Sequence, residues 1–125
     1  MFRLPALENR TWFSGGAAAS RKFDLQSPRE VRGEVIYVDS FGNLVSNIDR
    51  PIAERFGTRF RHKSLSVRIK RGAAMRILDA YGDAPKGAPL AIFGSFGLLE
   101  VAIRDGNAAM HFAAGTGTSV SLTRI

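Results

Sequence analysis

The chain has 125 residues, 45% of them hydrophobic and 23% charged, a composition typical of one folded domain with a single core. Eighteen Lys and Arg residues against eleven Asp and Glu give a formal net charge of +7. The lack of cysteine excludes disulfides, and His62 and His111 have no metal-ligand spacing, so we expect no metal site. No apolar run reaches the roughly 20 residues that cross a bilayer, so we expect no membrane segment.

Residues 1–32 show no sustained strand or helix period and are interrupted by Gly15-Gly16. We expect an irregular N-terminal arm here, followed by a domain over residues 33–125. Arg3 and Glu8 break the continuous apolar core that a secretory signal needs, which predicts a cytoplasmic protein.

Beyond the arm, short β-branched and apolar runs alternate with turns rich in Gly and Pro, which is typical of strands. The strands are expected over residues 31–39, 44–48, 65–70, 74–81, 90–93, 98–103 and 119–122. One short helix is expected from Asp49 to Phe56, because Pro51 suits a first helical turn and Gly57 follows the last. Six or seven short strands with one short helix predict an all-β antiparallel barrel or sandwich.

A basic segment from Arg55 to Arg76 holds eight Lys and Arg residues and no acid. Such a block can bind phosphates, so a basic β-barrel that binds nucleic acid is one hypothesis. In residues 65–70, however, basic side chains alternate with apolar ones, which places them on the solvent face of a strand without any ligand. We favour this second interpretation, since Phe60 is the only aromatic residue between Arg59 and Arg76 that could stack on a base.

The first candidate site lies where a strand ends in a turn that carries Asp39, Phe41 and Asn43. An Asn side chain offers both the donor and the acceptor that the N6/N7 edge of adenine requires, and a Phe ring can stack on a purine. The alternative interpretation is an ordinary Asn-containing turn with a core Phe.

A second candidate site follows the apolar strand 90–93, where Gly94-Ser95-Phe96-Gly97 offers backbone N–H groups and a hydroxyl suited to a carboxylate. Tyr81, just before a turn, offers either a second aromatic wall or ordinary packing. Glu100 lies inside an apolar strand, so we expect it to have a hydrogen-bond or ion-pair partner.

The order of these segments resembles the C-terminal domain of the S-adenosyl-L-methionine (SAM) hydrolase family, also called SAM hydroxide adenosyltransferases, which includes the chlorinases and fluorinases. The segments that carry the resemblance are residues 33–48, 81–83, 94–102 and 106–109. The resemblance covers about residues 33–125. It implies a β-barrel-like domain that packs as a trimer and supplies one wall of a site between subunits.

The same resemblance implies a site for SAM or adenosine, without a separate cofactor. Contacts to adenine are implied for Phe41, Asn43, Tyr81, Asn107 and Ala108. Contacts to the methionine portion are implied for Asp39, Ser95 and Phe96. Phe96 departs from the smaller or basic residue that some family members have there.

Complete family members have an N-terminal α/β domain whose residues bind the ribose and orient the water or halide that attacks. No segment of this sequence matches its Phe-His-Gly-Arg-Asp motif. The resemblance therefore implies that the chain holds no catalytic residue and works with a separate N-terminal catalytic subunit, or that it is a structural remnant. Hydrolase and halogenase chemistry both stay open.

Overall fold

The computed structural model describes residues 29–57 and 65–124. The chain divides into two units, residues 1–31 and 32–125, and the description below concerns the second. Residues 1–28 of the expected arm, together with Phe60 and His62, lie outside the described residues.

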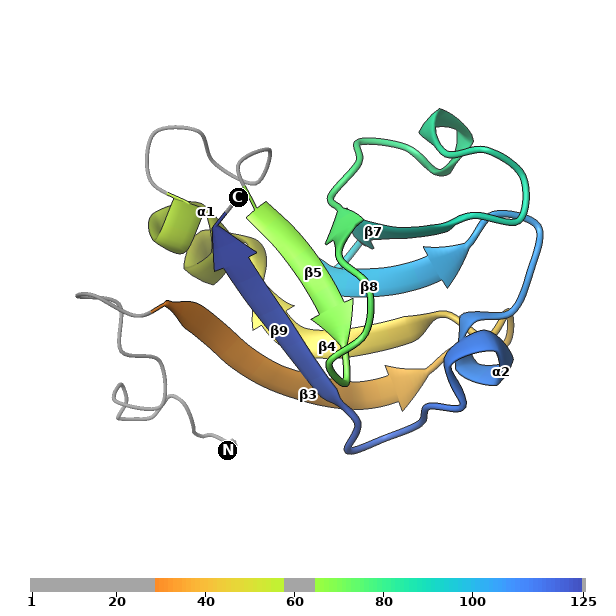
Figure 1. Ribbon diagram of the computed structural model, residues 1–125, viewed down its shortest axis with the longest axis horizontal. Helices are drawn as coiled ribbons and strands as arrows, with labels where there is room; N and C mark the ends of the chain where they lie inside the picture. The colour runs from red at the N-terminus through yellow and green to blue at the C-terminus, as the bar shows by residue number, and fades with distance from the viewer. Residues whose placement is uncertain (1–28, 58–64, 125) are drawn as a thin grey trace. The chain divides into compact units, whose positions relative to one another are not determined.

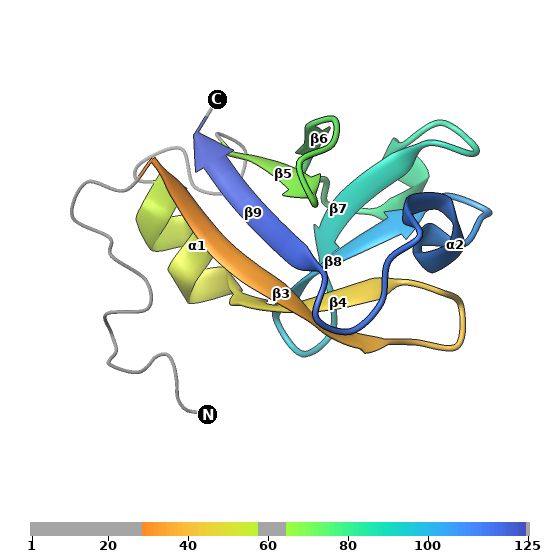
Figure 2. The ribbon, with the colours of Figure 1, turned by 60° about the horizontal axis from the view of Figure 1, so that its bottom comes forward.

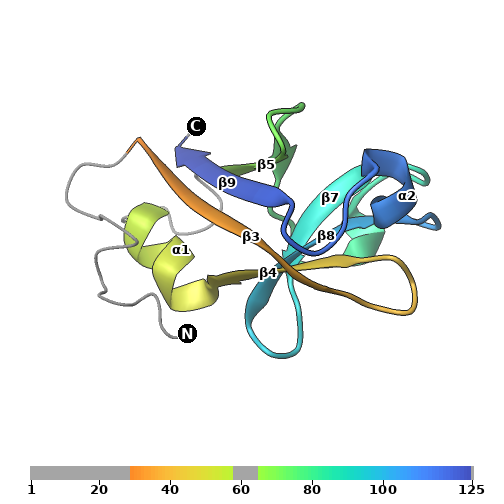
Figure 3. The same cartoon turned by 90° about the horizontal axis from the view of Figure 1, so that it is seen from below.

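The second unit is built on one seven-stranded sheet with short helices (Figure 1). The strands are β3 (Glu30–Val38), β4 (Leu44–Asp49), β5 (Leu65–Ile69), β6 (Met75–Arg76), β7 (Pro89–Phe93), β8 (Leu98–Ile103) and β9 (Ser119–Arg124). The helices are α1 (Arg50–Gly57), a 3-10 helix η3 (Tyr81–Asp83) and α2 (Ala108–Phe112). The two α-helices lie at opposite ends of the sheet (Figures 1 and 3).

The sheet curls until its two edges meet. The strand order is β6-β5-β9-β3-β4-β8-β7, and the pairs β3–β4, β4–β8, β7–β8, β5–β6 and β5–β9 are antiparallel. Ile77, just after β6, forms a parallel bridge with Ala91 of β7, and the amide of Leu78 donates to the carbonyl of Ala91 at 2.8 Å. This contact nearly closes the barrel (Figure 2) and confirms the predicted all-β fold of six or seven short strands.

The core forms because alternate strand residues turn toward the barrel interior. In β5 the side chains of Leu65, Val67 and Ile69 are buried, as the alternation predicts, while Arg68 is half-buried. The basic side chain of Arg68 has a backbone acceptor, since it donates to the carbonyl of Gly72 at 2.9 Å. Within the basic segment, β5 thus has the strand pattern that we favoured.

Two local elements differ from the sequence prediction. The strand expected over residues 74–81 is shorter, since β6 ends at Arg76, and the chain turns at Ala80 and Tyr81, whose carbonyls accept from the amides of Asp83 and Ala84. The helix α2 was not predicted, since five residues are too few to show a helical period.

Within the residues that the structure describes, no helix is both long enough and apolar enough to cross a membrane.

Candidate functional site

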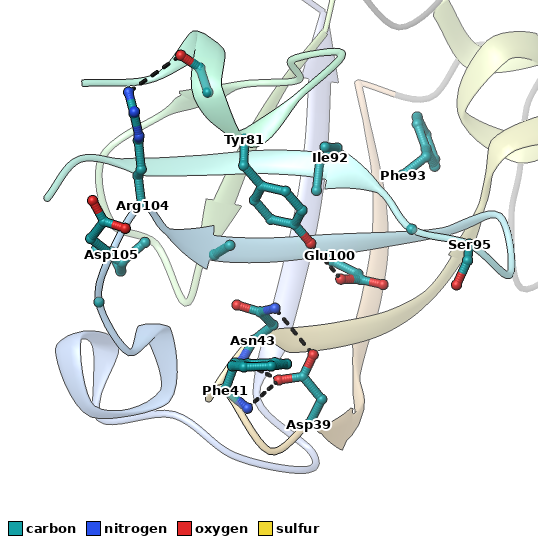
Figure 4. Close-up of a pocket in the computed structure, with 15 residues that line it drawn as sticks. Asp39, Phe41, Asn43, Tyr81, Ile92, Phe93, Ser95, Glu100, Arg104 and Asp105 are labelled. Atoms are coloured by element: carbon teal, nitrogen blue, oxygen red, sulfur yellow. Dashed lines mark hydrogen bonds between the residues drawn. The ribbon is translucent and has the colours of Figure 1, made fainter. Parts of the chain in front are cut away.

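A surface cavity of about 1130 Å³ is lined by residues of the β3–β4 turn, η3, strands β7 and β8 and the turns that follow these two strands (Figure 4). Five residues singled out in the sequence line it together: Asp39, Phe41, Asn43, Tyr81 and Ser95. The cavity floor includes Ile92 of β7 and Ala102 of β8, and acidic Glu100 also lines it. Residues of both candidate sites of the sequence therefore line one cavity.

The β3–β4 turn is organised by the carboxylate of Asp39. Its Oδ1 accepts hydrogen bonds from the amides of Phe41 and Asn43, both at 2.9 Å. Its Oδ2 accepts a third from Nδ2 of Asn43 at 3.1 Å. A short acidic side chain that bonds its own turn in this way fixes the backbone, so Asp39 orients both the ring of Phe41 and the carboxamide of Asn43.

The turn rests on the start of α2. Gly42 has a φ of +84°, and the place where a Cβ would lie is filled by the side chain of Asn107. Oδ1 of Asn107 accepts from the amide of Met110 at 2.9 Å and so caps α2, while the amide of Ala109 donates to the carbonyl of Gly42 at 2.9 Å. This explains why a glycine follows Phe41.

Two aromatic side chains face solvent at the cavity. Phe41 is 75% exposed and Tyr81 is 43% exposed. They come from the β3–β4 turn and from η3 and lie on opposite sides of Asn43 (Figure 4). Exposed aromatic faces around a hollow lined with a few polar groups are typical of a ligand site.

Glu100 lies in the middle of β8, opposite Ile92 of β7. The hydroxyl of Tyr81 donates to its Oε1 at 3.5 Å, so the expected partner of Glu100 is a hydrogen-bond donor. Burial, and then the charge of Asp39, raise the pKa of Glu100 above its ordinary value. Burial also raises the pKa of Tyr81, and the charges of Glu100 and Asp39 act in the same direction.

Ser95 lies in the tight β7–β8 turn. The amide of Gly94 donates to the carbonyl of Leu98 at 3.0 Å, and that of Gly97 to the carbonyl of Gly94 at 2.9 Å. These bonds hold the turn beside the cavity, with Ser95 in its lining.

Arg104 braces the other side of the cavity. Its guanidinium donates to the carbonyl of Ala84 at 2.8 Å. It also donates to the carbonyl of Gly82 at 3.3 Å (Figure 4). Its backbone carbonyl also accepts from the amide of Gly87 at 2.8 Å. Arg104 therefore ties the segment that carries Tyr81 to the end of β8. Sequence reasoning missed this residue, because its partners lie some twenty positions away and no local pattern marks them.

Residues 33–121 match the family described as the SAM hydroxide adenosyltransferase C-terminal domain, which is more than half of the chain. The chain belongs to this family. The (R)-S-adenosyl-L-methionine hydrolase of Thermus thermophilus is 33% identical over 90 residues, which cover 72% of this chain and 31% of that protein.

Two solved structures share the fold of this SAM hydroxide adenosyltransferase C-terminal domain. An uncharacterized conserved protein from Thermotoga maritima has a TM-score of 0.68 and 29% identity, with 80% of this chain and 38% of that one covered. A conserved hypothetical protein from Thermus thermophilus has a TM-score of 0.59 and 30% identity, with 80% and 37% covered. The chain thus spans less than two fifths of the length of these relatives.

Three residues that the resemblance linked to the ligand lie outside the cavity lining. Asn107 caps α2 beneath the β3–β4 turn, and Ala108 is fully buried. Phe96 is 91% exposed at the tip of the β7–β8 turn. Their contacts with a ligand stay predictions.

Proposed function

We propose that this domain binds the adenosine part of SAM and forms one half of a site for hydrolysing SAM to adenosine and methionine. The observation that carries this proposal is the convergence of Asp39, Phe41, Asn43, Tyr81 and Ser95 on one cavity. These residues come from three segments of the chain, and the family resemblance assigns each of them to the same ligand.

The carboxamide of Asn43 is suited to adenine. One N–H of its Nδ2 donates to Asp39, which fixes the rotation of the amide. The second N–H and Oδ1 then remain to donate to N7 of adenine and to accept from N6, the complementary pair on that edge. Phe41 and Tyr81 supply aromatic faces for the ring, each stacked base contributing about 1–3 kcal/mol.

The methionine portion of SAM extends, in this proposal, toward the β7–β8 turn. Ser95 offers a hydroxyl to its carboxylate, and the backbone amides of the turn provide an oriented dipole. Asp39 lies near enough to Glu100 to raise the pKa of that carboxyl, so it also contributes negative charge for the amino group.

Hydrolysis requires a water held in line with the bond from C5′ to the sulfonium. We propose that the groups orienting this water come from a separate N-terminal catalytic domain or subunit, and that this domain contributes binding and orientation alone. We also propose that the domain forms a homo-oligomer, a trimer, in which the exposed ring of Phe41 packs at the subunit boundary.

Calorimetric titration of the full chain with SAM and with adenosine tests the proposal, with Asn43→Ala as the variant. We expect wild-type binding that the variant loses, while its unfolding temperature stays close to that of the wild type. No heat from the wild type at millimolar ligand, a concentration range equivalent to about 4 kcal/mol of binding free energy, would contradict the proposal and favour a structural remnant.

A further inference from the structure

The cavity is negative although the chain as a whole carries a formal charge of +7. Among the described residues its lining holds three carboxylates, those of Asp39, Glu100 and Asp105, and one guanidinium, that of Arg104. The guanidinium is turned away to the carbonyls of Gly82 and Ala84. A hollow with this excess of acid attracts cations and repels anions.

The two carboxylates near Asn43, those of Asp39 and Glu100, differ in how many hydrogen bonds their oxygens already accept. Asp39 accepts three hydrogen bonds at 2.9 to 3.1 Å from its own turn. Glu100 accepts one, from Tyr81, at 3.5 Å, which is at the weak limit of hydrogen-bond geometry. Residues 29–57 and 65–124 provide no ion pair to Glu100. Glu100 therefore keeps most of its acceptor capacity for a group that enters the cavity.

The fold makes room for this carboxylate. Glu100 lies in β8 beside the end of β7, and its Oε2 occupies the place where a Cβ on residue 94 would lie. Because residue 94 is glycine, the carboxylate can lie against the β7–β8 turn, near Ser95 and facing Tyr81 (Figure 4).

We propose that Glu100 is a specificity-determining residue, whose carboxylate takes the cationic centre of the ligand, so that the site prefers positively charged SAM to neutral adenosine. This inference rests on the proposed function, since it concerns the same cavity. Two centres of SAM share this chemistry: the sulfonium and the ammonium of the methionine portion.

The electrostatics of the free site support the assignment. Burial and the charge of Asp39 raise the pKa of Glu100 and so disfavour its ionised form when the cavity is empty. A bound cation offsets both effects, because an opposite charge within a few ångströms favours the charged form of a carboxyl group. The ionised carboxylate is thus more favourable with a cationic ligand than without one. A neutral nucleoside provides no such compensation.

Titration of wild type and Glu100→Gln with SAM, S-adenosylhomocysteine and adenosine tests this proposal. We expect the variant to bind SAM about ten-fold more weakly, equivalent to about 1.4 kcal/mol, and adenosine within about two-fold of the wild type. Glu54→Gln on α1, the matched control outside the cavity, should bind every ligand as the wild type does. S-adenosylhomocysteine keeps the ammonium and lacks the sulfonium. If Glu100→Gln weakens the binding of SAM and of S-adenosylhomocysteine equally, Glu100 contacts the ammonium. If it weakens the binding of SAM alone, Glu100 contacts the sulfonium.

Gly94→Ala provides a second test that does not depend on whether Glu100→Gln folds well. The new Cβ displaces the flexible end of Glu100 without removing its charge, and we expect SAM binding to weaken more than adenosine binding. Equal losses for both ligands, or no loss for either, would overturn the inference and leave the proposed function intact. A wild type that binds neither ligand overturns both.

Discussion

At the scale of single residues, the site depends on a chain of contacts that begins with a carboxylate. Asp39 bonds the amides of its own turn, and the turn presents Phe41 and Asn43. This cluster could be predicted from sequence, because all of its contacts lie within five consecutive positions. Arg104 could not, since it acts on carbonyls of Gly82 and Ala84 that only the folded barrel brings near.

Gly42 occupies a position in this turn where a side chain has no room. Gly42→Ala forces a non-glycine residue to a φ of +84° and places a Cβ where the side chain of Asn107 lies. The left-handed conformation costs about 1–2 kcal/mol, and a disturbed helix cap adds about 1 kcal/mol. We expect denaturant unfolding to show a loss of about 2–3 kcal/mol, the sum of these two effects.

Gly115→Ala is the matched control for this prediction, because a Cβ on residue 115 has nothing within 4 Å. Its free energy of unfolding should stay close to that of the wild type. If the two variants lost the same stability, Gly42 would be an ordinary turn glycine and its close contact with Asn107 would not contribute to stability.

At the scale of elements, the sequence predicted those with a clear period or clear end signals. The alternation in β5 and the Pro51 and Gly57 signals of α1 correspond to the elements that the structure contains. The segment after β6 was predicted less well, since its apolar residues fit a strand while its amides form the turn of η3. Propensity does not say which hydrogen bonds a backbone makes.

Asp49 joins β4 to α1 and gives a prediction for the helix. Its Oδ1 accepts from the amide of Ile52 at 2.9 Å, so Asp49→Ala should cost about 1 kcal/mol of stability through loss of the N-cap. Asp49→Asn keeps the acceptor and should lose much less. Denaturant unfolding of the two variants beside the wild type measures both losses, and equal losses would show that the acceptor contributes nothing.

The pH dependence of stability distinguishes the capping hydrogen bond of Asp49 from the effect of its charge. Burial raises the pKa of Asp49, against the opposing effects of the Ile52 amide and the charge of Arg55. The folded state therefore holds the proton more tightly, and this contribution to stability is present below the ordinary value of 3.8 and is lost as the pH rises through the raised pKa. Thermal unfolding at several pH values should show wild type gaining on Asp49→Asn as the pH falls. A constant difference would contradict the burial effect.

At the scale of the whole molecule, the nearly closed barrel brings residues from three segments that are far apart in sequence into the lining of one cavity. The strand pattern predicted the barrel. The order of the family segments supported the choice of site residues, but which of them face the cavity could not be predicted. Asn107 has the chemistry of an adenine contact and yet caps α2, because the choice between these roles depends on how the β3–β4 turn packs on that helix.

The chain covers 31% of the length of the Thermus thermophilus hydrolase, which leads to a prediction about activity. We expect the purified 125-residue chain to bind SAM without releasing adenosine above the uncatalysed rate. Binding alone does not accelerate the reaction, because only a nucleophile held in line with the leaving sulfonium lowers the barrier. Chromatographic detection of adenosine, with calorimetry on the same sample as proof that the cavity is occupied, measures this. Adenosine formation that Asn43→Ala abolishes would instead place catalytic groups within this chain, with the ionisable residues of the cavity as the first to substitute.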